Sequence, residues 1–356
     1  MIGGHYYLIA FALAVIVVWL MTPVINYWGR RAGYVDQPNA RKMHHRPMVR
    51  LGGISIFLGC VIALVVVWQL GAFGVMLPKA EWEVWGVVLG GLAFFAVGLC
   101  DDLFELSPFS RLLIQVAISS VVWSMGVQIN FVTLPLLGDL LQLDVFSLPI
   151  TVIWLVGLAN AINWIDGLDG LAAGVCGISA VVLFVLCLFM EQSAAALIAV
   201  ALAGGALGFL RYNFSPAQIF MGDGGAYFMG FTLGGVAVIG LVKVAAVTTV
   251  AVTAVLLPYL VLAVPILDMS VVIFSRLIKG KSPFKADKGH LHHRLINAGI
   301  SQRLTVLFIY ALTLWGGSLA LGFSNIPSGW GFALGATCLL LYLGWQVWRD
   351  SRKVQE

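Results

Sequence analysis

Long apolar runs divide this chain into segments of membrane-spanning length. Runs of roughly 20 apolar residues can cross a bilayer as helices, whereas the strands of a membrane β-barrel give alternating segments of about ten residues. The pattern therefore predicts an all-α integral membrane protein with about eleven transmembrane helices. The predicted spans are residues 5–27, 51–71, 84–100, 110–128, 149–163, 171–190, 194–212, 226–242, 245–274, 304–323 and 329–348.

The composition supports a membrane protein and excludes several other classes. Hydrophobic residues make up 61% of the 356 residues, charged residues only 10%, and the mean hydropathy is +0.99. Soluble domains contain about 25% charged residues, so a soluble enzyme or a disordered chain is excluded. The net charge of +4 predicts no nucleic-acid partner. The five cysteines lie in apolar runs without metal-ligand spacing, so we expect neither a disulfide framework nor a zinc site from them.

Basic residues are distributed unevenly between the two sides of the predicted spans. With the N-terminus outside, 18 of the 20 Lys and Arg residues fall on the cytoplasmic side. This topology places the C-terminus and two long basic loops, 28–50 and 275–303, in the cytoplasm. No internal repeat of the kind common in transporters is convincing, and we expect one polytopic domain over residues 1–356. The outer segment 129–148 has Leu-Pro and Gly-Asp pairs that predict a short hairpin.

Three short segments on the cytoplasmic side are acidic. They contain Asp101, Asp102 and Glu105, then Asp166 and Asp169, then Asp223. If these segments converge, their carboxylates repel one another unless a cation lies among them. Oxygen ligands with water favour Mg²⁺, or Mn²⁺, over zinc. The alternative is that each acid is only a solvated helix end.

The most specific polar motif lies across the end of the fifth predicted span. Asn160, Asn163 and Asp166 recur every three residues, so they would form one stripe on a helix. The glycines that follow permit a tight turn into the next span. The alternative interpretation is that these polar side chains only join helices to one another.

A glycine-rich loop, Gly222-Asp223-Gly224, opens the eighth predicted span. Such a loop offers unpaired backbone N–H groups and a positive helix dipole to a phosphate, and Asp223 can hold a metal. Late in the ninth predicted span, Pro265 is followed by Asp268. There the proline can kink the helix, and Asp268 either belongs to the site or caps and pairs locally.

The last motif lies in the long loop 275–303. His290, His292 and His293 precede Arg294, and imidazoles beside an arginine suit a diphosphate. A zinc site is less well supported because no cysteine completes the ligand set. The alternative is an ordinary basic loop on the cytoplasmic side.

These motifs, in this order and on one side of the membrane, resemble the bacterial polyprenyl-phosphate N-acetylhexosamine-1-phosphate transferases. The resemblance runs from about residue 36 to residue 295. The histidine loop resembles the branch that uses UDP-GlcNAc rather than the peptidoglycan branch, which typically carries three consecutive histidines. The shared motifs are Arg41-Lys42-Met43-His44-His45-Arg46-Pro47 with Arg50-Leu51-Gly52-Gly53, the Asp101-Asp102 pair, the segment from Asn163 to Asp169, the Gly222-Asp223-Gly224 loop and the segment His290–Arg294.

The resemblance implies roles for particular residues. Asn163 and Asp223 would coordinate a catalytic Mg²⁺, and Asp169 would meet the uracil. Asp101 and Asp102 would lie beside the lipid phosphate, where Asp101 deprotonates or orients it. The remaining substrate contacts would come from Lys42, Asp166, His290, His292, His293 and Arg294.

The resemblance also implies a reaction and a location. GlcNAc-1-phosphate would pass from UDP-GlcNAc to undecaprenyl phosphate, releasing UMP, at the cytoplasmic face of the bacterial inner membrane. The product would start a cell-envelope polysaccharide, such as lipopolysaccharide or teichoic acid. The rival interpretations are the phospho-MurNAc-pentapeptide transferase of peptidoglycan synthesis and, from another class, an ion-coupled transporter. The sequence leaves a homodimer open.

Overall fold

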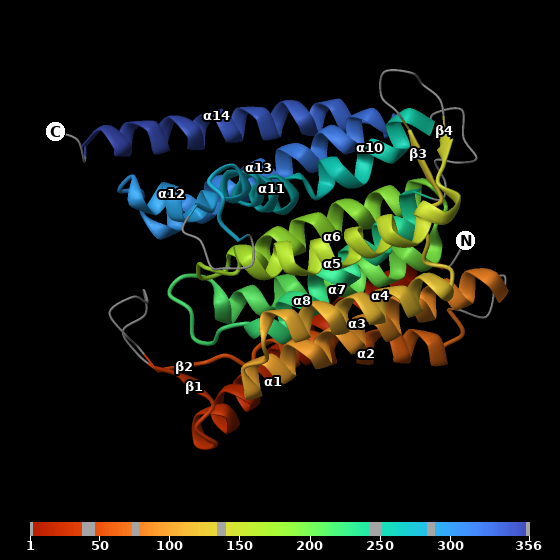
Figure 1. The fold of residues 1–356 in the computed structure, drawn as a ribbon, viewed down its shortest axis with the longest axis horizontal. Coiled ribbons are helices and arrows are strands. Elements are labelled where there is room, and N and C mark those ends of the chain that lie inside the picture. Colours follow the sequence, from red (N-terminus) through yellow and green to blue (C-terminus); the bar gives the residue numbers. More distant parts are fainter. Residues whose placement is uncertain are drawn as a thin grey trace.

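The computed structural model describes residues 3–37, 47–72, 78–133, 140–242, 251–282 and 289–353. Within these ranges the chain forms a bundle of helices with two short strand pairs (Figure 1). The strands are β1 (Val35–Asp36), β2 (Met48–Val49), β3 (Phe131–Thr133) and β4 (Leu140–Gln142). The α-helices are α1 (Gly4–Arg31), α2 (Gly53–Gln69), α3 (Pro78–Phe104), α4 (Pro108–Ser124), α5 (Ser147–Ile165), α6 (Leu171–Phe189), α7 (Ser193–Asn213), α8 (Gly222–Ala237), α10 (Ala251–Val261), α11 (Ala263–Ile278), α12 (Leu291–Asn297), α13 (Gln302–Phe323) and α14 (Gly329–Lys353).

The predicted membrane helices are confirmed in part. In the described ranges, eight helices are long and apolar enough to cross a bilayer, and each coincides with a predicted span. The other three predicted spans, 51–71, 110–128 and 245–274, form shorter helices. Both α2 and α4 have 17 residues, which corresponds to about 25 Å of helix, against about 30 Å of hydrocarbon. The chain is thus an all-α integral membrane protein, and the count of eleven stays a prediction.

The described part of the predicted span 245–274, from residue 251 on, forms two helices rather than one. Helix α10 ends at Val261 and α11 begins at Ala263, with Leu262 outside helical geometry at φ −106° and ψ 19°. Pro265 contributes to the break, because its ring clashes in a continuous helix with the carbonyl four residues earlier, that of Val261. Beside the break lies an apolar cavity of about 400 Å³. Its lining comes from α10, α11 and α13: Leu256, Tyr259, Leu260, Ala263, Ile266, Leu267 and Phe323.

Helix α8 is the centre of the bundle, and its apolar span is buried throughout. It packs against α3, α5 and α2. The approach of α3 is close, because a Cβ added to Gly98 would overlap the backbone carbonyl of Asp223. Only glycine allows this contact, which brings the end of α3, with Asp101 and Asp102, to the start of α8.

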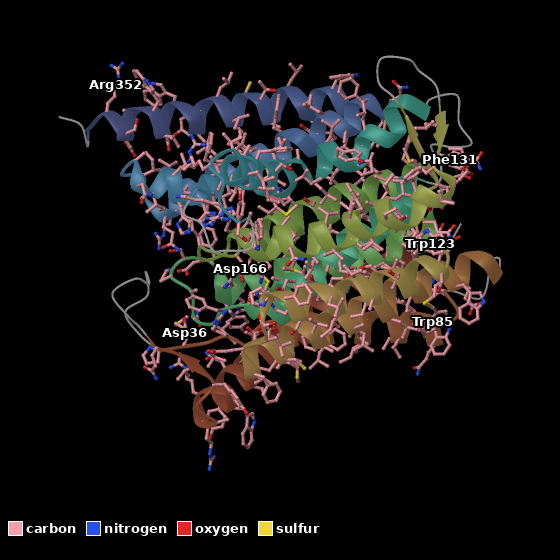
Figure 2. The ribbon with its side chains drawn as sticks, in the orientation of Figure 1. Asp36, Trp85, Trp123, Phe131, Asp166 and Arg352 are labelled. Atoms are coloured by element: carbon pink, nitrogen blue, oxygen red, sulfur yellow. The ribbon has the colours of Figure 1, made fainter. Side chains whose placement is uncertain are left out.

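The acidic segments gather at one end of the bundle. Asp36 and Asp166 lie at that end, whereas Trp85, Trp123 and Phe131 lie at the other (Figure 2). The two chain ends that Figure 1 marks also lie at opposite ends of the bundle. The convergence of the acidic segments is confirmed, because Asp102 bonds to the start of α8 while Asp166 and Asp223 line one cavity. The side of the membrane on which they lie stays a prediction.

The two strand pairs lie at opposite ends. Strands β3 and β4 pair antiparallel within the segment 129–148, so the predicted hairpin is confirmed. Strands β1 and β2 also pair antiparallel, with Val35 opposite Val49 and Asp36 opposite Met48. This second pair was not predicted. It brings Asp36 and the residue after β2, Arg50, to the acidic end.

Candidate active site

A polar cavity of about 380 Å³ lies at the acidic end of the bundle. It is formed where α5 and α8 meet the turn after α5, the strand pair β1–β2 and the starts of α12 and α13. Its lining residues are Asp36, Arg50, Asn163, Asp166, Gly167, Leu168, Asp169, Asn213, Phe220, Gly222, Asp223, His293 and Gln302.

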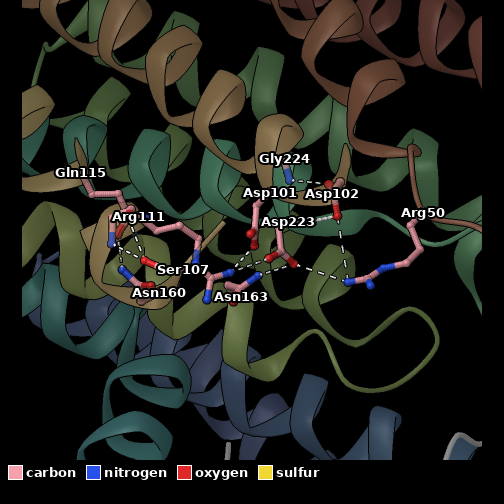
Figure 3. A network of polar contacts seen from close by, with 11 residues as sticks. Arg50, Asp101, Asp102, Ser107, Arg111, Gln115, Asn160, Asn163, Asp223 and Gly224 are labelled. Carbon is pink, nitrogen blue, oxygen red and sulfur yellow. Dashed lines mark hydrogen bonds and ion pairs between the residues drawn. The ribbon is translucent and has the colours of Figure 1, made fainter. Parts of the chain in front are cut away.

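Asp223, in the first turn of α8, is the centre of a polar network (Figure 3). Its Oδ1 accepts a 3.0 Å hydrogen bond from the Asn163 side-chain amide and lies 3.7 Å from Nη2 of Arg50. Its Oδ2 lies 3.2 Å from Nη1 of Arg111. The same Arg111 nitrogen pairs with Asp101 Oδ2. Two guanidinium groups therefore counter the charge of Asp223, one of them shared with Asp101.

Asp102 caps the start of α8. Its two carboxylate oxygens accept 3.0 Å hydrogen bonds from the backbone N–H groups of Asp223 and Gly224. A carboxylate at a helix N-terminus satisfies unpaired donors and complements the helix dipole. The expectation that these N–H groups are open to a phosphate is wrong, because Asp102 already occupies two of them.

Asp166 follows the last residue of α5 and faces the cavity. Burial, together with the negative charges of Asp102 and Asp169, raises its pKa to about 7 although Arg50 opposes the shift. Ionisation of Asp166 is therefore unfavourable without more positive charge in the cavity. A bound cation would supply that charge.

The turn after α5 is held to the loop before α8 by side chains. Asp169 Oδ2 accepts a 3.0 Å hydrogen bond from the backbone N–H of Ala217. Asn213, which is buried, accepts from the N–H of Gly170 and donates to the carbonyl of Ile219, both at 3.0 Å. These bonds join two cavity walls that are far apart in the sequence.

Helix α12, which carries the histidine segment, forms another wall of the cavity. His293 lines the cavity, and its ring centroid lies 4.3 Å from that of His292. His292 is buried against the backbone of Gly167. Burial, assisted by the neighbouring His293, lowers the pKa of His292 to about 4, so this ring is neutral at physiological pH. His290 is buried and pairs with Asp268 of α11.

The oxygen donors of this cavity suit a hard divalent cation. Asp223, Asn163 and Asp166 line the same cavity, and carboxylate and amide oxygens are the ligands that Mg²⁺ accepts. In the described part of the chain, no group of three or more His, Cys, Asp or Glu side chains forms a ready-made metal site. A cation here would therefore draw the rest of its coordination from substrate phosphates and water, as Mg²⁺ commonly does.

Comparison with known proteins identifies the family. The sequence profile described as Glycosyl transferase family 4 matches residues 84–241. A probable undecaprenyl-phosphate N-acetylglucosaminyl 1-phosphate transferase of Bacillus subtilis (strain 168) is 35% identical over 305 residues, which cover 85% of this chain and 81% of that protein. The chain belongs to glycosyl transferase family 4. The predicted family is thereby confirmed.

Two further relatives carry similar names. A decaprenyl-phosphate N-acetylglucosaminephosphotransferase of Mycolicibacterium smegmatis is 35% identical, over 87% of this chain and 79% of the relative. An undecaprenyl-phosphate alpha-N-acetylglucosaminyl 1-phosphate transferase of Haemophilus influenzae is 30% identical, over 85% of this chain and 81% of the relative. All three relatives of this family 4 chain are named as enzymes that act on a prenyl phosphate and an N-acetylglucosaminyl phosphate group.

The structure brings some of the predicted site residues of this family 4 protein together and separates others. Asp101 and Asp102 lie behind Asp223 rather than on the cavity wall, and His290 and His292 lie behind His293. Lys42 lies outside the described residues. The predicted site residues that line the cavity are Asn163, Asp166, Asp169, Asp223 and His293.

Arg294 does not line this cavity, contrary to the expectation that it binds with the histidines. It lines a separate cavity of about 240 Å³ that Ser275 and Lys279 share. Successive residues of a helix point about 100° apart, and α12 is rotated so that His293 faces the polar cavity while Arg294 faces the other one. The predicted stripe of Asn160, Asn163 and Asp166 does not face the cavity as a whole. Asn163 and Asp166 line the cavity, whereas Asn160 donates a 2.7 Å hydrogen bond to Gln115 of α4.

Two arginines that pair with the buried acids were not among the site residues predicted from the sequence. Arg50 and Arg111 supply the positive charge that the buried acids need. A signal was present, because a buried carboxylate pair such as Asp101-Asp102 requires a nearby cation. Arg111 is the first basic residue after that pair, and Arg50 opens the Arg-Leu-Gly-Gly motif. Asp36 and Gln302 gave no comparable signal.

Proposed function

We propose that this chain transfers GlcNAc-1-phosphate from UDP-GlcNAc to undecaprenyl phosphate, giving undecaprenyl-diphospho-GlcNAc and UMP. The observation that carries the proposal is that Asn163 and Asp223, 60 residues apart in the sequence, meet on the wall of one polar cavity. The names of the relatives support the choice of both substrates. The reaction would initiate a cell-envelope polysaccharide at the cytoplasmic face of the inner membrane.

Asp223 and Asn163 would hold Mg²⁺, or Mn²⁺ in its place, with Asp166 facing the same cavity. When bound, the cation neutralises the substrate diphosphate and lowers the repulsion between the two anions that must meet. Arg50 and Arg111 add positive charge beside Asp223. Positioning and charge neutralisation of this kind supply most of the catalysis in phosphoryl transfer.

The chemistry is phosphoryl transfer, so the bond between the sugar and its phosphate is retained. A lipid phosphate oxygen attacks the β-phosphorus, and the bond from that phosphorus to UMP breaks. A phosphate monoester has a second pKa of about 6, so the attacking oxygen is largely deprotonated at neutral pH without a strong base. Asp101 is buried and paired with Arg111, and we assign it an electrostatic role rather than that of a general base.

The residues on the cavity walls support a placement for each substrate. Asp169 would meet the uracil from the turn after α5, and His293 would meet the diphosphate from α12. The prenyl chain needs an apolar surface open to the bilayer, and the 400 Å³ cavity beside the break between α10 and α11 offers one. Asp102 acts indirectly, since it fixes the start of α8 and thereby the position of Asp223.

A nucleotide-sugar panel tests this function. Purified protein with undecaprenyl phosphate is expected to release UMP from UDP-GlcNAc and not from UDP-MurNAc-pentapeptide. EDTA should abolish the release and added Mg²⁺ should restore it, because the carboxylates of the cavity need a cation to accept a diphosphate. Release of UMP only from the pentapeptide substrate would contradict this proposal and show that the chain belongs to the peptidoglycan branch. Full activity in EDTA, with thermal unfolding unchanged, would contradict the metal site.

A further inference from the structure

Both carboxylate oxygens of Asp268, in α11, form hydrogen bonds with the start of the histidine segment His290–Arg294. Its Oδ2 lies 2.7 Å from Nδ1 of His290, and its Oδ1 accepts a 2.7 Å hydrogen bond from the backbone N–H of Leu291. Both side chains of the Asp268–His290 pair are more than nine-tenths buried. One aspartate therefore fixes the first residues of α12 from a helix more than 20 positions earlier in the sequence.

The pairing with Asp268 determines how His290 carries its proton. An ionised carboxylate only accepts hydrogen bonds, so Nδ1 of His290 must be the donor. In a neutral imidazole the lone pair then lies on Nε2. Two other rings pack against the His290 ring: Trp164 in a T-shaped arrangement with the ring centroids 5.8 Å apart, and His292 in a nearly parallel one with the centroids 5.7 Å apart.

The three histidine rings connect Asp268 to the cavity. The His290 ring stacks on His292, and His292 contacts His293, which lines the cavity. His292 packs against the backbone of Gly167, another residue of the cavity wall. Displacement of His290 would therefore be passed to His293 through closely packed rings.

We propose that Asp268 is a positioning residue for the nucleotide sugar: it fixes the orientation of His290 and the start of α12, and so holds His293 at the diphosphate. The proposal rests on the function proposed above and adds a residue outside the cavity to its binding machinery. A simple helix cap would account for the Leu291 hydrogen bond alone. It would not account for the buried pairing with the His290 ring.

Asp268→Asn separates these two roles. The amide oxygen can still accept from Leu291, whereas the amide nitrogen opposite His290 makes Nδ1 an acceptor and reverses the tautomer. We expect kcat/KM for UDP-GlcNAc to fall about 10- to 100-fold, mainly through KM, as for outer residues that orient a ligand-binding histidine. The KM for undecaprenyl phosphate and the unfolding temperature should stay close to wild type. Thr313→Val, which alters another buried polar group with a local hydrogen bond, is the matched control.

A second variant keeps the test decisive if Asp268→Asn unfolds. His290→Asn removes the ring directly and should reproduce the selective rise in KM for UDP-GlcNAc. In a His293→Asn background, Asp268→Asn should add no more than about a twofold loss, because the two residues act in series. Wild-type kinetics in both Asp268→Asn and His290→Asn, or fully additive losses with His293→Asn, would overturn the proposal. Absence of UMP release by the wild-type protein would instead overturn the proposed function.

Discussion

Asp223→Asn should lower UMP release about 10³-fold or more without unfolding the protein. The carboxylate is the shared partner of Asn163, Arg50 and Arg111. Asparagine keeps the shape but removes the charge, and loss of several kcal/mol of transition-state stabilisation corresponds to about three powers of ten in rate. The backbone N–H of residue 223 can still donate to Asp102, so α8 should keep its cap.

The control for this prediction is another neutralised carboxylate. Asp350 lies on α14 in an exposed pair with Arg349, remote from the cavity. The substitution Asp350→Asn should therefore leave UMP release unchanged. Surface pairs of this kind contribute about 0–1 kcal/mol to stability. Both variants should be compared by initial rate across a Mg²⁺ titration and by thermal unfolding in detergent. Near-wild-type rates for Asp223→Asn with an unshifted Mg²⁺ dependence would refute the metal assignment.

Gly222→Ala should both destabilise the protein and inactivate it. Gly222 has φ +76°, a conformation that costs an L-residue about 1–2 kcal/mol. The added Cβ would also overlap the carbonyl oxygen of Arg50 and lie 2.6 Å from Asp102 Oδ2. The backbone has little room to yield, because hydrogen bonds tie it to the other segment: the N–H groups of Gly52 and Gly53 donate to the carbonyls of Phe220 and Met221 at 2.9 and 2.7 Å.

We expect the free energy of unfolding to fall by about 2–5 kcal/mol, the sum of the backbone cost and of overpacking. Gly280→Ala is the matched control, because Gly280 also has a positive φ, +65°, but a Cβ there would meet nothing within 4 Å. Gly280→Ala should lower the free energy of unfolding only by the backbone contribution of about 1–2 kcal/mol and should keep its activity. Chemical denaturation and UMP release measured on both variants separate the two terms. Equal stability of the two variants would show that the contact with Arg50 and Asp102 does not constrain the site.

Much of the bundle could be predicted from the apolar pattern, because a bilayer requires long apolar helices with internally paired backbones. The break of residues 245–274 into two helices was less accessible. Pro258 lies inside α10 without ending it, whereas Pro265 coincides with a break. The difference depends on packing that a single sequence does not display. Strands β1 and β2 have two residues each, too short to give an alternating pattern.

The acidic half of the site was predictable because Asp101, Asp102, Asp166, Asp169 and Asp223 are rare charges beside apolar helices. Their individual tasks were not predictable. Asp102 caps α8 although its neighbour pairs with Arg111, and that distinction depends on the register of α3 against α8. The separation of Arg294 from His293 likewise depends on how α12 is rotated, which its seven residues do not reveal in sequence.

The most direct test of the central claim follows one oxygen atom through the reaction. Purified wild-type protein, undecaprenyl phosphate and Mg²⁺ are incubated with UDP-GlcNAc that carries ¹⁸O between the sugar and the β-phosphorus, and the products are analysed by mass spectrometry. Phosphoryl transfer at the Asp223 cavity predicts UMP as the released nucleotide and full retention of the label in undecaprenyl-diphospho-GlcNAc. Release of UDP, or loss of the label from the lipid-linked sugar, would contradict the account.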